Sequence, residues 1–341
     1  MKKIVTFGEM MLRLKPVENQ RIIQTDQYSG LYGGAEANVA ASLSLLGDHA
    51  EFLSKVPDNA VGQAAIGTLR KYGVDTSKII QGGPRLGIYF FEKGASVRNT
   101  SVVYDRAGSS FAVSSSDEYQ WESILQDADY FYFSGITPAI SAETKQAVFD
   151  AVKYCNEHDV RVICDLNYRG KMWSEKEAQE TMNQLMPYVN VCLANDEDFE
   201  SALGIKAFDG DMEHGIEQKE DFIKGMKKIT EKYPNCQTVA SVLRNIHSVE
   251  SSQWTALMVD HGEVFETPVY NMHVWEGVAG GDAFAAGLIH GIMNDFDKKE
   301  RIDYAIAASV LKLTISGDLN LVTDSEVRAV MDKQNGMRVV R

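Results

Sequence analysis

The sequence is poor in cysteine and contains no long apolar run. Four of its 341 residues are cysteine, none forms a CxxC pair, and no histidine stands at zinc-site spacing from them. This pattern excludes a disulfide scaffold and a structural zinc site, and it predicts reduced core thiols in a cytoplasmic protein. A membrane-spanning helix needs about 18 consecutive apolar residues, which occur nowhere. Glu9 and Arg13 interrupt the apolar N-terminus, which argues against a signal peptide.

Basic residues are outnumbered, with 34 Lys and Arg against 48 Asp and Glu and a formal net charge of −14. A general nucleic-acid binder needs a basic face, so that class is excluded, whereas local groups can still bind small anions. Contents of 44% hydrophobic and 24% charged residues exclude disorder as the main state. A chain of this length forms about two domains or one large α/β domain.

The common nucleotide and hydrolase motifs are absent as well. The chain has no GxxxxGK[ST] P-loop, no GxGxxG after a predicted strand, no HExxH and no GxSxG. Their absence excludes a P-loop enzyme and leaves an oxidoreductase or a lipase without any supporting motif.

A regular alternation of strands and helices is present instead. Buried apolar runs predict strands at 4–7, 130–133, 160–166, 189–194, 237–243 and 256–259. Helices are expected at 35–46, 59–72, 141–158, 174–186, from 195 onward, and at 281–293, 302–314 and 323–331. Capping residues support several of these helices: Ser141, Ser174 with Glu177, and Thr323 with Glu326. The alternation predicts a doubly wound α/β fold with a mostly parallel sheet and helices on both faces.

Two segments break this rhythm. Polar and apolar residues alternate in 14–32 and 88–107, and glycines flank both. We expect them to form a small antiparallel β lid that leaves a single domain spanning 1–341. A half-apolar lid sheet also predicts a homo-oligomer. The acidic stretch from Asp209 to Asp221 is interpreted as a solvated surface insertion.

The segment VAGGDAFAAG, residues 278–287, carries the clearest chemistry. Two glycines precede Asp282, which opens an apolar helix. Unpaired amides and the positive end of the helix dipole form an anion site there, and paired glycines let the backbone approach a ligand. An acid beside such a site suits phosphoryl transfer to a hydroxyl, because the acid accepts the proton while the amides stabilise the transferred group. The alternative is an ordinary capped helix.

Here the sequence resembles a known family. GGDAFAAG looks like the second signature of the PfkB (ribokinase-like) carbohydrate kinases, and GGAEANVA at 33–40 is similar to the first. VTFGEMMLRL, VVYDRAGS and CDLNYR most resemble the 2-keto-3-deoxygluconate kinase branch. The resemblance covers essentially the whole chain. It implies a ribokinase-like fold and ATP-dependent, Mg²⁺-assisted phosphorylation of 2-dehydro-3-deoxy-D-gluconate at its terminal hydroxyl.

The resemblance also implies roles for individual residues. Asp282 matches the catalytic base, and the backbone of Ala279, Gly280 and Gly281 matches the anion hole. The residues that match substrate contacts are Gly34, Asn38, Tyr89, Tyr104, Arg106, Arg169 and Asp318. Those that match the nucleotide site are Asn167, Asn195, Arg244 and Ser248, with Asp198 at the metal. Arg106 and Arg169 suit an acidic sugar, since a guanidinium binds a carboxylate through two parallel hydrogen bonds.

The chain departs from the family pattern D-R-V-G-x-G-D before the base. Glu276, Gly277 and Ala279 replace Asp, Arg and Gly, and Asp198 replaces a longer Glu. A backbone-made anion hole tolerates Ala279 if its φ is negative. Two alternatives therefore stay open: a kinase for a neutral sugar such as fructose or ribose, and a weakly catalytic sugar-binding protein. We expect a sugar acid and ATP as ligands and neither nucleic acid nor membrane as a partner.

Overall fold

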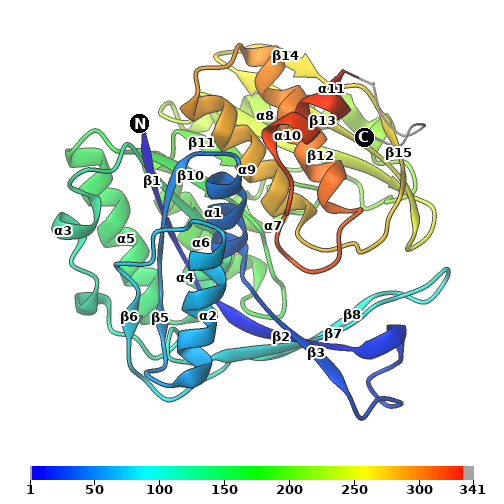
Figure 1. Ribbon diagram of the computed structural model, residues 1–341. Helices are drawn as coiled ribbons and strands as arrows, with labels where there is room; N and C mark the ends of the chain where they lie inside the picture. Colours follow the sequence, from blue (N-terminus) through cyan, green and yellow to red (C-terminus); the bar gives the residue numbers. More distant parts are fainter. Residues whose placement is uncertain (1, 333–341) are drawn as a thin grey trace.

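The main sheet of the protein is mostly parallel, as the alternation of strands and helices predicts. The computed structural model describes residues 2–332, and the sheet has the order β14-β13-β12-β11-β10-β9-β1-β4, with β15 beside β13 (Figure 1). Strands from β12 to β4 run parallel, and β13, β14 and β15 pair antiparallel at one edge. The strands are β1 (Lys3–Phe7), β4 (His49–Leu53), β9 (Tyr130–Ser134), β10 (Arg161–Asp165), β11 (Val191–Leu193), β12 (Thr238–Ile246), β13 (Ser251–Asp260), β14 (Glu263–Glu266) and β15 (Tyr270–His273).

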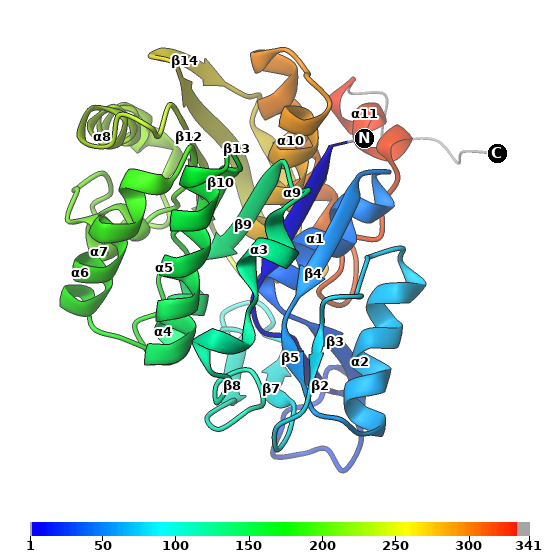
Figure 2. The same cartoon turned by 90° about the vertical axis from the view of Figure 1, so that its left-hand side faces the viewer.

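Helices cover both faces of this sheet (Figure 2). One group comprises α1 (Ala35–Leu45), α2 (Ala60–Lys71), α9 (Gly280–Met293), α10 (Lys298–Lys312) and α11 (Asp324–Met331). The other comprises α3 (Trp121–Leu125), α4 (Ile136–Ile140), α5 (Ala142–Glu157), α6 (Glu175–Leu185), α7 (Asp198–Leu203) and α8 (Lys219–Lys232). Alternate residues of β1 point into different cores: Val5 and Phe7 lie with α5 and α6, and Ile4 lies with α1 and α9. The sheet therefore separates two hydrophobic cores.

The predicted N-terminal capping residues of the helices are confirmed. Ser174 and Glu177 form a capping box at the start of α6, and Thr323 and Glu326 form one at α11. Gly47, which follows α1, has a φ of 96°, a backbone conformation that residues with a side chain rarely adopt. The structure adds elements that were not predicted, among them β4, β14, β15 and α8, because short edge strands and polar helices have weak patterns.

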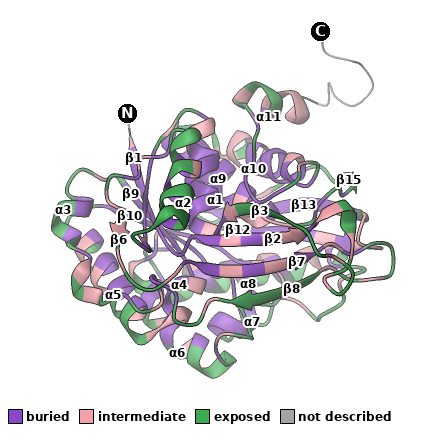
Figure 3. Cartoon of the chain, turned by 60° about the horizontal axis from the view of Figure 1, so that its bottom comes forward, coloured by how far each residue is buried: buried purple, intermediate pink, exposed green. Residues whose placement is uncertain are grey.

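Four strands form the lid: β2 (Met11–Pro16), β3 (Tyr28–Gly33), β7 (Gly87–Glu92) and β8 (Ser101–Asp105). The pairs β2–β3 and β7–β8 are antiparallel, as expected, but β2 and β7, which join the two excursions, pair in parallel. The lid projects from the main body at the lower right of Figure 1. Burial falls from β2 and β7 toward the largely exposed β8 (Figure 3), so β8 is a solvated outer edge.

The cysteines and the acidic stretch lie as the sequence predicts. All four cysteines are buried and unpaired, which agrees with core thiols. None of the helices among residues 2–332 is long and apolar enough to cross a membrane. The acidic stretch is a mostly exposed loop from 209 to 215, followed by a short 3-10 helix (Ile216–Gln218), and α8 begins at Lys219. A short β5–β6 pair (Lys55–Val56 with Ile80–Gln81) completes the strands.

Candidate active site

A cavity of about 390 Å³ lies between the lid and the carboxyl ends of the parallel strands. This edge of an open α/β sheet is where ligands bind, because the loops that follow the strands converge there. Most of the residues singled out from the sequence line it: Gly34, Asn38, Tyr89, Tyr104, Arg106, Asn167, Arg169, Asn195, Asp198, Arg244, Ala279, Gly281, Asp282 and Asp318. Gly280 is buried just behind the wall, and Ser248 does not line the cavity.

The N-terminus of α9 forms one wall. Ala279, the residue before the helix, has φ 58° and ψ 19°, so the condition of a negative φ, under which alanine is tolerated without strain, is not met. A left-handed alanine is costly and turns the backbone sharply into the helix. A Cβ at Gly280 would lie 3.2 Å from Leu313 and 3.4 Å from Trp254, whereas Gly281 faces open space. Gly280 thus allows Leu313 and Trp254 to pack closely against the start of α9, and Gly281 leaves the first backbone amides of the helix accessible from the cavity.

Asp282, in the first turn of α9, is held by Asn38. The amide nitrogen Nδ2 of Asn38 donates to Oδ2 of Asp282 at 2.7 Å, and Asn38 lies in the first turn of α1. The net pKa of Asp282 is raised to about 6. Burial is the largest cause and nearby Glu36 adds to it, whereas the hydrogen bond from Asn38 opposes the rise. A carboxylate with a pKa near neutrality and one oriented oxygen is well suited to accept a proton.

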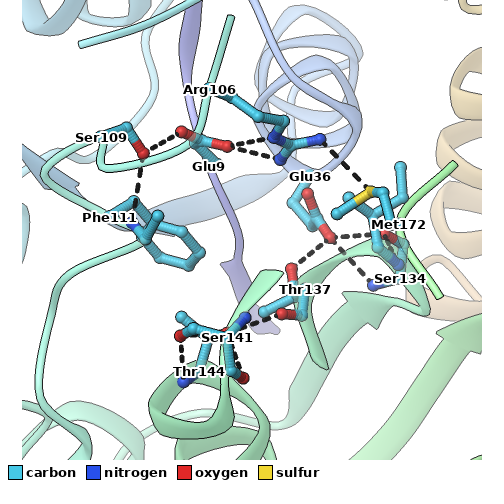
Figure 4. Close-up of polar contacts among 12 residues, drawn as sticks. Glu9, Glu36, Arg106, Ser109, Phe111, Ser134, Thr137, Ser141, Thr144 and Met172 are labelled. Carbon is cyan, nitrogen blue, oxygen red and sulfur yellow. Dashed lines mark hydrogen bonds and ion pairs between the residues drawn. The ribbon is translucent and has the colours of Figure 1, made fainter. Parts of the chain in front are cut away.

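Arg106 is already paired with a carboxylate of the protein. Its guanidinium contacts Glu9, and the hydroxyl of Ser109 also donates to Glu9 (Figure 4). No local pattern predicts this pair, because Glu9 follows β1 and Arg106 follows β8. The ion pair orients Arg106 and reduces its free charge, so its expected grip on an acidic ligand is weaker than a lone guanidinium would have.

Arg169 differs from Arg106 in this respect. It follows β10, is exposed at the cavity, and donates to the carbonyl oxygen of Tyr168 at 3.3 Å. It makes no ion pair with any residue in the described part of the chain. Its positive charge lowers the pKa of Asp282 and of Asp198. Arg169 is therefore the cation of the cavity that remains available to a ligand carboxylate.

Glu36 is a site residue that was missed from the sequence. It lines the cavity, is buried, and accepts hydrogen bonds from the backbone and hydroxyl of Ser134 and the hydroxyl of Thr137 (Figure 4). Burial raises its pKa. A Cβ at Gly8 would lie 2.0 Å from the Glu36 carboxylate, so Gly8 makes room for it. The acidic residue inside GGAEANVA was the available signal, since a charge rarely lies on an apolar helix without a role.

Some residues of the cavity wall are those expected near the nucleotide. Asp198 accepts from the backbone amides of Tyr168 at 2.7 Å and Asn195 at 2.9 Å, and it therefore fixes the loops after β10 and β11. Burial raises the pKa of Asp198 to about 6. The side chain of Asn195 accepts from the amide of Val242 at 3.0 Å. These contacts order the loops around the cavity.

Arg244 lines the cavity, whereas Ser248 does not. Arg244 pairs with Asp196 and lies over the ring of Trp254, with 5.4 Å to the ring centroid. Ser248 lies in the turn between β12 and β13, where its hydroxyl accepts from the amides of Glu250 and Ser251. The structure does not bring Ser248 to the cavity, because β12 extends to Ile246 and carries the turn past it.

Acidic groups dominate the cavity wall. Within residues 2–332, eight carboxylates line it with three arginines: Glu9, Glu36, Asp165, Asp196, Glu197, Asp198, Asp282 and Asp318 against Arg106, Arg169 and Arg244. Burial, with Asp198 and Asp282 nearby, raises the pKa of Asp165 well above its usual value. Oδ1 of Asp165 and Oδ1 of Asn167 are buried without a hydrogen-bond partner. Such a wall accepts a polyphosphate only together with a cation.

Comparisons with known proteins agree with this arrangement. The model of the pfkB family carbohydrate kinases matches residues 1–324. A 2-dehydro-3-deoxygalactonokinase of Haloferax volcanii is 32% identical over 96% of both chains. The crystal structure of a 2-dehydro-3-deoxygluconokinase from Thermotoga maritima is 43% identical, with a TM-score of 0.93 over 97% of this chain and 100% of its own. A putative ribokinase II from E. coli, solved with ATP and Mg²⁺, shares the fold at 18% identity, with a TM-score of 0.80 over 98% and 100% of the two chains.

Proposed function

Because the chain belongs to the pfkB family of carbohydrate kinases, we propose that it phosphorylates a keto-deoxy sugar acid, 2-dehydro-3-deoxy-D-gluconate, at its terminal hydroxyl. The chain is a sugar kinase, a phosphotransferase that acts on an alcohol group with ATP as the donor. The relatives are named for two sugar acids that differ in the orientation of one hydroxyl, and the higher identity is to the gluconate enzyme. The guanidinium of Arg169, which has no ion pair within the described residues, is the observation that favours a sugar acid over a neutral sugar as the substrate.

The catalytic steps follow from the cavity wall. Asp282 accepts the proton of the terminal hydroxyl through the carboxylate that Asn38 orients, and the oxygen then attacks the γ-phosphorus of ATP. The bond between that phosphorus and the bridging oxygen to the β-phosphate breaks, and ADP leaves. The open amides at the start of α9 stabilise the charge that spreads over the transferred group. Arg169 holds the substrate carboxylate away from Asp282, so that the far end of the sugar acid reaches the base.

Mg²⁺ fits this cavity as a companion of ATP. Within residues 2–332 no group of three or more His, Cys, Asp and Glu side chains could hold a metal ion alone. Mg²⁺ commonly binds through one or two protein oxygens together with substrate phosphates. Asp165, Asn167 and Asp198 offer such oxygens, two of them buried without a partner. Bound there, Mg²⁺ would neutralise phosphate charge against the acidic wall.

An assay of ADP release with a panel of substrates tests the proposal. The panel contains 2-dehydro-3-deoxygluconate, its C4 epimer, fructose and ribose, each with ATP and Mg²⁺. We expect kcat/KM for a keto-deoxy acid to exceed that for either neutral sugar by at least about tenfold, the value of one charge-assisted contact. Faster turnover of fructose or ribose would favour the neutral-sugar kinase, and no turnover of any compound would favour the sugar-binding protein.

The pH dependence of turnover should depend on Asn38. The base must be ionised, so kcat/KM should fall as the pH drops below about 6, the pKa of Asp282. Asn38 lowers that pKa by its hydrogen bond. Asn38→Ala should therefore move the acidic limb of the profile to higher pH, besides slowing turnover. Asn235→Ala, at an exposed asparagine outside the cavity, should leave the limb in place. An identical limb in all three proteins would assign it to another group, such as ATP.

A further inference from the structure

A cluster of buried charges lies behind the cavity, where the lid meets the start of α9. Arg13 of strand β2 and Glu276 are both fully excluded from solvent and form an ion pair, although 263 positions separate them in the sequence. Nη1 of Arg13 also lies 3.4 Å from Oδ2 of Asp318, and its guanidinium carbon lies 4.0 Å above the ring of Phe91. One side chain thus joins the lid, the segment before α9 and a residue of the cavity wall.

The side chain and the backbone amide of Glu276 are both held by hydrogen bonds or ion pairs. Oε1 accepts from Arg13 and from the amide of Gly317 at 2.9 Å, and Oε2 pairs with Lys15 of the same lid strand. The amides of Trp275 and Glu276 donate to the carbonyl oxygen of Leu313 at the end of α10. The segment formed by Trp275 and Glu276 is therefore held by contacts from the lid strand β2 and from the end of α10.

The segment that Glu276 anchors shapes the anion site. Glu276 stands three residues before Ala279, whose left-handed conformation sets the direction in which α9 begins. A non-glycine residue keeps such a conformation only when its surroundings hold it there. Glu276 supplies that restraint, because its side chain and its backbone amide are both fixed.

Stability alone is a poor reason for this cluster. Buried ion pairs lose much of their attraction to the cost of desolvation, and apolar replacements are often as stable or more so. Lys312, also buried, lies near Asp318 and Glu276, and burial lowers its pKa to about 8. Arg13, Lys15 and Lys312 are thus concentrated with the carboxylates of Glu276 and Asp318 where the lid meets the segment before α9. A requirement for fixed geometry explains this cluster better.

We propose that Arg13 is a positioning residue for phosphoryl transfer: its guanidinium couples the seating of the lid to the shape of the anion site at the start of α9. The coupling runs from β2 through Glu276 to Ala279, and through Asp318 to the substrate side of the cavity. This inference rests on the proposed kinase function. It predicts that loss of Arg13 loosens the segment before α9 and slows transfer more than it weakens substrate binding.

Four variants test the coupling. Arg13→Met keeps the apolar contact with Phe91 but leaves Glu276 short of a partner, and Arg13→Lys keeps the charge but cannot reach Glu276 and Asp318 together. Arg13→Met/Glu276→Gln removes both charges of the pair. Arg98→Met is the matched control, because Arg98 is a lid-side arginine that pairs with Glu92 and does not line the cavity. Thermal unfolding, kcat, KM and amide exchange in residues 274–281 are measured for each.

Arg13→Met should lower kcat by about 10- to 100-fold, as expected for a small misplacement of reacting groups, with KM values changed less than about threefold. Its amide exchange in 274–281 should be faster than in the wild type. The double variant should recover thermal stability but not kcat, Arg13→Lys should fall between, and Arg98→Met should match the wild type.

A merely structural role predicts a different outcome. If Arg13 only compensates the charge of Glu276, the double variant recovers kcat together with stability, and that result would overturn the proposal. Unchanged exchange in 274–281 in Arg13→Met would overturn it as well. The exchange measurement does not depend on turnover. A wild-type protein without kinase activity would therefore refute the proposed function, but amide exchange would still test the link between Arg13 and residues 274–281.

Discussion

Asp282→Asn should lower kcat by at least about a hundredfold while ATP still binds. A positioned general base contributes about 10²- to 10⁴-fold, and asparagine cannot take the proton from the attacking hydroxyl. The isosteric amide keeps the shape of the site and leaves the anion-binding amides of α9 untouched. Turnover with the keto-acid and ATP affinity by calorimetry are the two measurements. Near-normal turnover in this variant would remove Asp282 from the mechanism.

The stability of the same variant provides a control for its folding. Burial raises the pKa of Asp282 from 3.8 to about 6, so the native state binds more protons than the unfolded state between these values. The stability contribution of Asp282 therefore decreases as the pH rises through this window. Asp282→Asn should melt slightly above the wild type at pH 8, and the difference should vanish near pH 4. Loss of turnover with this gain in stability identifies a functional group rather than a structural one.

Arg169→Ala should raise KM for 2-dehydro-3-deoxygluconate by about tenfold to over a hundredfold. A charge-assisted hydrogen bond to a carboxylate contributes about 1.5–3 kcal/mol, and Arg169 is the guanidinium of the cavity with no ion pair of its own in the described chain. The kcat should change less, because the carboxylate lies at the end of the substrate opposite the reacting hydroxyl.

Arg106→Ala is the informative comparison for Arg169. Arg106 is paired with Glu9, so its removal should also disturb Glu9 and Ser109 and should change KM less selectively. With a neutral sugar of similar size as the substrate, Arg169→Ala should have little effect on KM. Equal losses for acid and neutral substrates in Arg169→Ala would contradict a carboxylate clamp.

Much of the site was predictable because it is encoded in short segments. The GGDAFAAG run predicted a helix that begins beside Asp282, and the strand–loop blocks placed Asn167, Arg169 and Asn195 at one edge of the sheet. These predictions depend on rules that act over a few residues: helix N-termini expose amides, and parallel strands end at a common edge. The family resemblance then supplied the roles.

What escaped prediction depends on contacts between distant segments. The pairing of Arg106 with Glu9 and of Arg13 with Glu276 joins residues that no local pattern connects. The left-handed conformation of Ala279 could not be predicted, because the surrounding loops and not its own preference set its φ. Ser248 was assigned to the nucleotide from its place in the chain, but β12 runs further than its apolar core suggested and carries the turn away.

The most direct test of the account compares one substrate with and without its charge. Wild-type kcat/KM is measured with ATP for 2-dehydro-3-deoxygluconate and for its carboxamide, which keeps size and hydroxyls but carries no negative charge. A site that selects a sugar acid through Arg169 predicts a preference for the acid of at least about tenfold. Equal values for the two compounds, or a preference for the amide, would contradict a sugar-acid kinase.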